Sequence, residues 1–259
     1  MAKKRIILAL IVAVLPFVFW FKIQSWINDP LRFQEQSIWL WPLALFIVFN
    51  AFLCLSFLLL SKGLKFVVIL SNFLAFLLFS GFNEILLLGV AISFLFQLVS
   101  MSVISKESKN RLQFKFYSAL KPGLSRLVTS LLILISFVYF LSSGVQASVR
   151  KKELPPSIQK TIQVIVGNYV GENLEIQNPR LKAETSSQVL GQINEFLQPY
   201  FKFLPPILAF ALFIILQGLS FIFVWLSLLL AFIIFAVFKK TGLIRIDKKP
   251  QEAEVISFD

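Results

Sequence analysis

The sequence predicts an all-α, polytopic integral membrane protein: a helix bundle with six transmembrane helices. Three observations predict this class: a composition that is 58% hydrophobic, six long apolar stretches, and positive charge that alternates between successive loops of the 259-residue chain. Soluble domains contain about 45–50% apolar residues. A soluble fold of this length would leave too much apolar surface in water. Lipid is therefore the expected solvent for most of the chain, in line with its mean hydropathy of +0.82.

A helix that spans the hydrocarbon core of a membrane needs about 20 residues, most of them apolar. Five stretches in the first part of the chain meet or approach this length: residues 5–21, 38–60, 64–80, 85–104 and 127–142. The first stretch follows a basic start, as a signal peptide would, but it ends in bulky residues where a cleavage site needs small ones. We therefore expect an uncleaved first helix.

The sixth stretch, residues 204–238, is longer than one membrane crossing requires. As a single helix its 35 residues would extend about 52 Å, against a hydrocarbon core of about 30 Å. A hairpin of two short helices, broken at Gln217-Gly218, is the alternative. The hairpin would move the basic tail, residues 239–259, to the other side of the membrane, against the orientation rule. We expect one long tilted helix whose first turns project beyond the bilayer.

The distribution of charge gives the orientation. On one side, the ends of the chain and the loops hold 16 basic and 5 acidic residues, whereas the other side holds 9 basic and 8 acidic residues. Because basic loops stay in the cytoplasm, both termini are expected there. Nearly all of the net charge of +12 then faces anionic lipids of the cytoplasmic leaflet, and nucleic-acid binding is not expected. The strong asymmetry and the small size favour a bacterial-type cytoplasmic membrane.

Residues 143–203 form the one long polar segment outside the apolar stretches. It contains two amphipathic helical patterns, one that places Ile158 and Ile162 on a single face and one that begins near Ser186. Two such helices bury too little apolar surface to fold alone. We expect a small extracytoplasmic helical cap that packs on residues 204–212 or lies on the lipid surface.

The basic cytoplasmic loop of residues 105–126 is also amphipathic, with Leu112, Phe116 and Leu120 on one helical face and Pro122-Gly123 at its expected end. An interfacial helix of this kind turns its apolar face to the membrane and its basic face to the headgroups. The loop predicts contacts with anionic lipid headgroups, and a role in topology alone is the alternative. The candidate headgroup contacts are Lys109, Arg111, Lys115 and Lys121.

Ionisable residues are nearly absent from the apolar stretches. Glu84 is the nearest, in a short turn, and we expect it at the interface rather than at a pore mouth. Neutral polar residues line up on several helices, and helix packing is the favoured interpretation because Ser, Asn and Gln form hydrogen bonds between membrane helices. The alternative is a pathway for a solute. The candidate intramembrane polar positions are Asn50, Asn72, Glu84, Gln97 and Gln217.

No pattern typical of an enzyme or of a cofactor site is present in the sequence. Without His there is no imidazole ligand and no Ser-His-Asp triad, and no Gly-rich phosphate loop occurs. The lone cysteine, Cys54, cannot form an internal disulfide. Five acidic residues of the outer segment, expected as a solvated face, are the only candidates for lipid chemistry: Glu153, Glu172, Glu175, Glu184 and Glu195.

These features favour a non-enzymatic scaffold or accessory subunit of a membrane assembly, with no cofactor. The expected partners are the lipid bilayer, other membrane-protein subunits or a second copy of the chain. A transporter or channel for a neutral or lipid-like solute is the alternative function. A membrane enzyme that acts on lipid ranks third.

Overall fold

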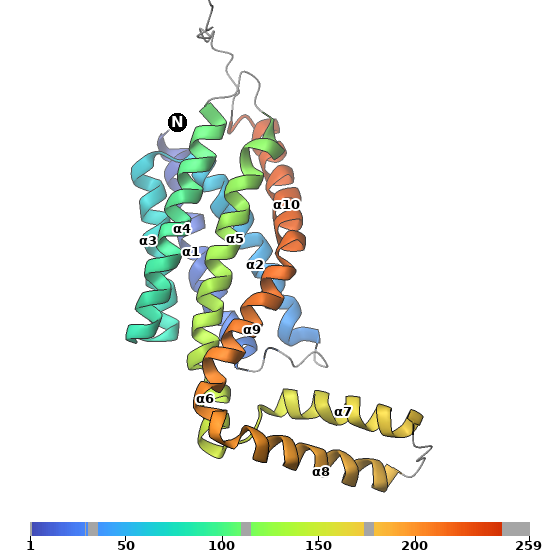
Figure 1. Ribbon diagram of the computed structural model, residues 1–259. Helices are drawn as coiled ribbons and strands as arrows, with labels where there is room; N and C mark the ends of the chain where they lie inside the picture. The colour runs from blue at the N-terminus through green and yellow to red at the C-terminus, as the bar shows by residue number, and fades with distance from the viewer. Residues whose placement is uncertain (1, 29, 31–35, 110–114, 174–178, 245–259) are drawn as a thin grey trace, which may run out of the picture.

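The computed structural model describes residues 2–28, 30, 36–109, 115–173 and 179–244. Every regular element of this described part is helical, so the expected all-α fold is confirmed. Five long helices stand side by side and form most of the bundle (Figure 1). They are α1 (Ala2–Ile27), α2 (Gln36–Leu59), α3 (Lys62–Ser80), α4 (Glu84–Lys109) and α5 (Phe116–Leu141).

The remaining helices build a cap at one end of the bundle and then return through it (Figure 1). In chain order they are α6 (Ser143–Lys151), α7 (Pro156–Asn173), α8 (Pro179–Leu197), the 3-10 helix η1 (Gln198–Phe203), α9 (Leu204–Gly218) and α10 (Ser220–Lys240). We call the end that holds α6–α8 the cap end. The opposite end, where α1 begins and α10 ends, is the basic end, and Lys106, Lys239 and Lys240 are exposed there.

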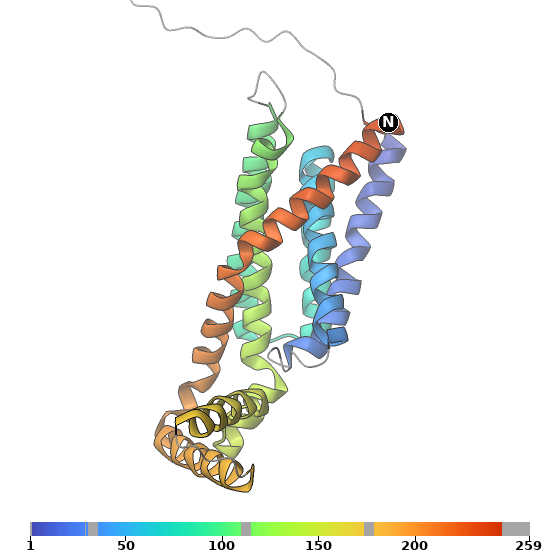
Figure 2. The ribbon, with the colours of Figure 1, turned by 90° about the vertical axis from the view of Figure 1, so that its right-hand side faces the viewer.

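Seven helical segments of the described chain are long and apolar enough to cross a membrane, one more than the six expected. The last two, Ala183–Gly218 and Ser220–Lys240, are separated by a single residue. Leu219 keeps helical dihedral angles, φ −84° and ψ −6°. α9 and α10 therefore continue in one general direction with a bend between them, and the hairpin alternative does not occur (Figures 1 and 2). Together they cross the bundle once, which gives six crossings in all.

Three helices extend at least five residues beyond the apolar stretches that predicted them. α1 runs to Ile27 through Pro16, α4 runs to Lys109, and α5 begins at Phe116 and runs through Pro122. The expectation of a separate interfacial helix that ends at Pro122-Gly123 is therefore wrong. The reason is packing: Phe116, Leu120 and other apolar residues of this segment are buried inside the bundle. Neighbouring helices make proline tolerable within a membrane helix.

The bundle consists of two parts, which contact each other directly through α2, α3, α4 and α5 and which α10 also joins. In one part α1 packs against α2 and α3, and in the other α4 packs along α5. α10 runs diagonally across both (Figure 2) and contacts α2 and α5. The ring of Phe223 lies 5.3 Å from that of Phe46 on α2, and the ring of Phe235 lies 5.0 Å from that of Phe116 on α5.

The cap has a small core of its own at the start of α9. Leu154, Phe201 and Leu204 are buried there, and Ile158 and Ile162 of α7 pack on them. Asn194 of α8 accepts a hydrogen bond at 3.2 Å from the backbone N–H of Leu154 through its Oδ1. The two cap helices thus depend on α9 as a third surface, as the sequence predicts.

α7 and α8 form an antiparallel pair that lies crosswise to the bundle axis, and we call this pair the arm. It extends sideways past the bundle in Figure 1 and is seen nearly end-on in Figure 2. In both views α7 lies between α8 and the bundle. The arm meets the rest of the described chain at the end where α6, η1 and the start of α9 lie, and from there it extends past the bundle in Figure 1.

Candidate functional site

The polar stripe of α4 lies against α5. Ser93 Oγ donates a hydrogen bond to the backbone carbonyl of Ser130 at 2.8 Å, and Ser130 Oγ donates one to the carbonyl of Ser93 at 3.1 Å. Gln97 Nε2 donates to Ser130 Oγ at 3.1 Å. All three side chains are fully buried. One serine of α5 therefore joins two positions, one helical turn apart, on α4.

α4 and α5 approach closely because small residues line their contact. Ser100 Oγ donates to the carbonyl of Gly123 at 2.6 Å. A Cβ atom on Gly123 would collide with the side chain of Ile104, and one on Gly89 would lie 2.7 Å from Cγ of Phe137. Small residues at such contacts are typical of membrane helix pairs, and this arrangement is what the packing interpretation requires.

Two further predicted amides lie in the α1–α3 part of the bundle. Trp20 Nε1 donates to Oδ1 of Asn72 at 3.1 Å, which links α1 to α3. Asn50 Nδ2 donates to the carbonyl of Phe46, one turn earlier in α2, at 2.8 Å. Both amide side chains are fully buried. Among the described residues, the hydrogen bonds pair these amides with other residues and not with each other.

Each of three predicted amides also keeps one buried polar atom that lacks a hydrogen-bond partner within the described part of the chain. These atoms are Asn50 Oδ1, Asn72 Nδ2 and Gln97 Oε1, and Ser227 Oγ on α10 is in the same condition. An unpaired buried polar group costs about 1–3 kcal/mol. A polar atom of a solute would be stabilised beside any of them, which is the feature a solute pathway requires.

The other two predicted positions lie near the bundle surface. Gln217 is partly buried, and its Oε1 accepts a hydrogen bond from Thr129 Oγ1 at 3.3 Å, between α9 and α5. Glu84 is exposed in the first turn of α4 at the cap end, where the helix dipole favours a carboxylate.

Lys65 was not among the predicted site residues, yet it is the buried cation of the described bundle core. Its Nζ donates to Ser105 Oγ at 2.8 Å and ties the start of α3 to α4 near the basic end. Sequence spacing did not distinguish Lys65 from the loop lysines around it. One signal in the sequence was available: Lys65 falls in the first turn of an apolar helix, where the helix dipole makes a positive charge unfavourable.

The structure separates the predicted headgroup contacts. Arg111 and the side chain of Lys109 lie outside the described residues. Lys115 is exposed immediately before α5 begins. Lys121 is exposed on the first part of α5 and lines a pocket that sequence reasoning did not find.

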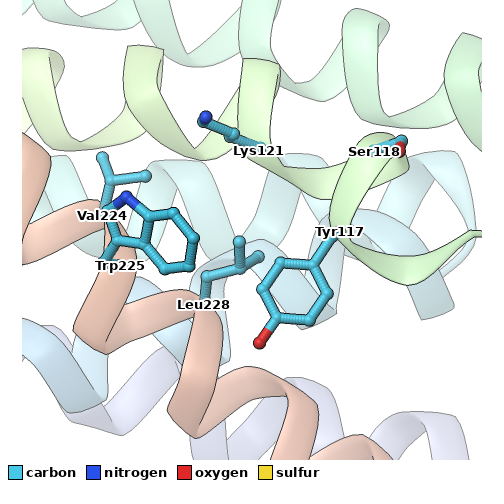
Figure 3. Close-up of a pocket in the computed structure, with 6 residues that line it drawn as sticks. All are labelled: Tyr117, Ser118, Lys121, Val224, Trp225 and Leu228. Carbon is cyan, nitrogen blue, oxygen red and sulfur yellow. The ribbon is translucent and has the colours of Figure 1, made fainter.

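This pocket lies between α5 and α10 and has a volume of about 200 Å³. Figure 3 shows the ammonium group of Lys121 on one side, the rings of Trp225 and Tyr117 on the others, and Leu228 between the rings. The Lys121 Nζ lies 5.7 Å from the centre of the Trp225 ring, within the range of a cation–π contact. The Tyr117 and Trp225 rings are 6.3 Å apart. The full lining is Tyr117, Ser118, Lys121, Val224, Trp225 and Leu228.

The arrangement provides one cation, aromatic walls and an apolar floor. In the described chain, no three His, Cys, Asp or Glu side chains are grouped so that they could hold a metal ion. Glu153, Glu184 and Glu195 are exposed. The side chains of Glu172 and Glu175 lie outside the described residues.

Comparisons with protein-family models, with curated proteins and with solved structures returned no match. The apolar helical bundle therefore stands as the evidence for a multi-pass membrane protein.

Proposed function

We propose that the protein is a non-enzymatic scaffold or accessory subunit of a membrane assembly. One observation carries the proposal: the arm reaches sideways from the bundle at the cap end (Figure 1) and exposes large apolar side chains. Val164, Ile165 and Phe196 are 60%, 61% and 75% exposed. Exposed apolar groups on a projecting element mark an interaction surface.

The direction of Ile165 supports a partner within the membrane plane. Gly167 of α7 faces α8, since a Cβ atom there would lie 3.8 Å from Ser186 Oγ. Ile165 is two residues away, which is about 200° around a helix, so it lies on the side of α7 opposite α8. Since α7 lies between α8 and the bundle in both views, that side of α7 is turned toward the bundle (Figures 1 and 2). A neighbouring integral subunit beside the bundle would meet it.

The interior of the bundle agrees with a structural role. Ser93, Gln97 and Ser130 connect α4 to α5, and Asn72 connects α3 to α1 through Trp20. These hydrogen bonds use polar groups to hold helices together, as is common in membrane bundles.

The proposal includes the orientation of the chain in the membrane. The basic end carries Lys62, Lys106, Lys239 and Lys240 as exposed residues, and basic segments favour the cytoplasmic side. Both termini would then be cytoplasmic, and the arm would lie on the outer face of a bacterial-type cytoplasmic membrane.

The test is gentle extraction of the full chain from native membranes, followed by mass determination of the intact particle. A defined complex with other proteins is expected. The Ile165→Ser variant should lose the partner. Ile6→Ser is the matched control, because Ile6 is an exposed isoleucine of α1 outside the arm. A monomer or a homo-oligomer with lipid alone would contradict the proposal, and so would equal loss of the partner in both variants.

A transporter or channel for a neutral or lipid-like solute is the second candidate function. The unpaired atoms of Asn50, Asn72 and Gln97 favour it. Flux measured in reconstituted vesicles tests it: substitution of Asn50, Asn72, Gln97 or Gln217 by Leu should abolish flux while the helices remain folded. Loss of stability without any wild-type flux supports helix packing instead.

A further inference from the structure

We propose that the pocket between α5 and α10 binds one anionic phospholipid. The phosphate would lie beside Lys121 and an acyl chain would lie along Val224 and Leu228. The proposal is independent of the arm and of any protein partner, because all six lining residues belong to two bundle helices.

The position of Lys121 calls for an anion. Lys121 lies on α5 about 7 Å along the axis from Phe116, where the helix begins, and before the apolar stretch of residues 127–142. A lysine near the end of a membrane helix keeps its charged group at the level of the headgroups. The contact with the Trp225 ring holds the ammonium group over the pocket. A phospholipid phosphate is the negative charge that a membrane supplies at that level.

The order of the lining residues along the bundle matches an amphiphile. α5 descends from the basic end and α10 ascends toward it (Figure 1). Tyr117 therefore lies nearest the basic end, Lys121 is about one turn deeper, and Val224 begins the deeper part of the α10 wall. A lipid with its headgroup at the mouth of the pocket and an acyl chain on the apolar wall would contact both the charged and the apolar part of the lining. Tyr117, at the mouth, is also of a residue type that favours the membrane interface.

The surrounding charge favours an anionic lipid over a zwitterionic one. Lys62, Lys106 and Lys239 are exposed at the same end of the bundle, and basic groups attract anionic lipids to that side of the membrane by about 1 kcal/mol per charge. The pocket opens between helices that face lipid, with Trp225 more than half exposed. A lipid already in the bilayer reaches it by lateral diffusion, whereas a small soluble anion would have to leave water for an apolar wall.

The experiment is native mass spectrometry of the full chain, reconstituted in phosphatidylcholine vesicles that contain a minor fraction of phosphatidylglycerol. Lys121→Gln removes the charge, and Lys121→Arg keeps it. Lys115→Gln is the matched control, since Lys115 is an exposed lysine just before the same helix and outside the pocket lining. Trp225→Leu removes the aromatic wall. Trp41→Leu is its control, because Trp41 is an exposed tryptophan on α2, at the cap end.

The wild type, Lys121→Arg, Lys115→Gln and Trp41→Leu should each retain one phosphatidylglycerol in preference to phosphatidylcholine. Lys121→Gln should bind it at least about tenfold more weakly, as expected when a charged hydrogen bond is lost. Trp225→Leu should also bind it more weakly. Equal retention by Lys121→Gln and the wild type would overturn the proposal. So would an equal loss in Lys115→Gln, or no preference for the anionic lipid. Lys121 is exposed, so its variants test the site even if Trp225→Leu unfolds.

Discussion

Ser93 and Ser130 exchange hydrogen bonds across the α4–α5 contact: each hydroxyl donates to the backbone carbonyl of the other residue, at 2.8 and 3.1 Å. The exchange fixes the register of the two helices, because shifting either helix by one residue would break both bonds. Ser130 Oγ also accepts from Gln97. Ser130 is thus the polar centre of the most extensive helix contact in the described bundle.

Replacing Ser130 by Ala should lower the free energy of unfolding by about 0.6–2 kcal/mol, the range measured for interhelical hydrogen bonds in membranes. The loss follows because Gln97 Nε2 and the carbonyl of Ser93 each lose a partner. Unfolding in detergent mixtures, followed by circular dichroism, measures it. Ser125→Ala, at an exposed serine of the same helix, should change little. A Ser130→Ala variant as stable as Ser125→Ala would show that the exchange contributes nothing.

Replacing Ser227 by Ala should not lower the free energy of unfolding, in contrast to Ser130→Ala. Ser227 is fully buried on α10, and its Oγ has no hydrogen-bond partner in the described structure. Removing a buried polar atom that lacks a partner also removes its desolvation cost of about 1–3 kcal/mol. The same unfolding measurement should therefore show unchanged or increased stability. A clear destabilisation would mean that the hydroxyl has a partner in the membrane, such as a solute or a lipid.

Gly123→Ala should destabilise the bundle by about 1–3 kcal/mol, the usual cost of overpacking. The added Cβ would meet the side chain of Ile104 and would lie 3.1 Å from the carbonyl oxygen of Ser100. Gly63→Ala is the control: it lies on α3, where a Cβ would meet nothing within 4 Å, and Ala favours a helix by about 0.5–1 kcal/mol. Thermal unfolding should order the proteins as Gly63→Ala, wild type and Gly123→Ala, from most to least stable.

Phe201→Ala should loosen the cap without unfolding the bundle. Phe201 is 3% exposed at the centre of the small cap core, whereas Phe203, two residues on, is 51% exposed. A buried Phe→Ala change costs about 3–5 kcal/mol. Hydrogen exchange should accelerate in α7 and stay slow in α4 and α5, and Phe203→Ala should leave both rates nearly unchanged. Faster exchange throughout the molecule would show that cap and bundle unfold together.

Cys54 should react with a maleimide only after unfolding. It is the single cysteine of the chain, and its side chain is fully buried on α2. The rate of labelling in mild detergent then reports opening of the bundle and provides an independent scale for the variants above. Rapid labelling of the native protein would contradict the packing around α2.

Much of the fold could be predicted from the sequence, because long runs of Phe, Leu and Ile have no stable place outside lipid. The expected end of a helix at Pro122-Gly123 was wrong because that expectation follows from helices in water. In the bundle, Gly123 permits the close contact with α4 that keeps the helix intact through Pro122.

The candidate site was only partly predictable. Gln97 stood out because polar residues on α4 recur at helical spacing, and the structure places it at Ser130. The pocket at Lys121 could not be predicted, because Trp225 lies in an uninterrupted apolar run with no local signal. Only the diagonal course of α10 brings it to α5.

That diagonal course has a consequence for biosynthesis. A ribosome delivers α1–α3 and then α4–α5 to the membrane long before α10 is made. Until then, α2 lacks the Phe46–Phe223 contact and α5 lacks the Phe116–Phe235 contact. Until α10 is made, the two parts are held by the direct contacts that α2 and α3 make with α4 and α5. The last helix to be translated then adds the contacts that span both parts.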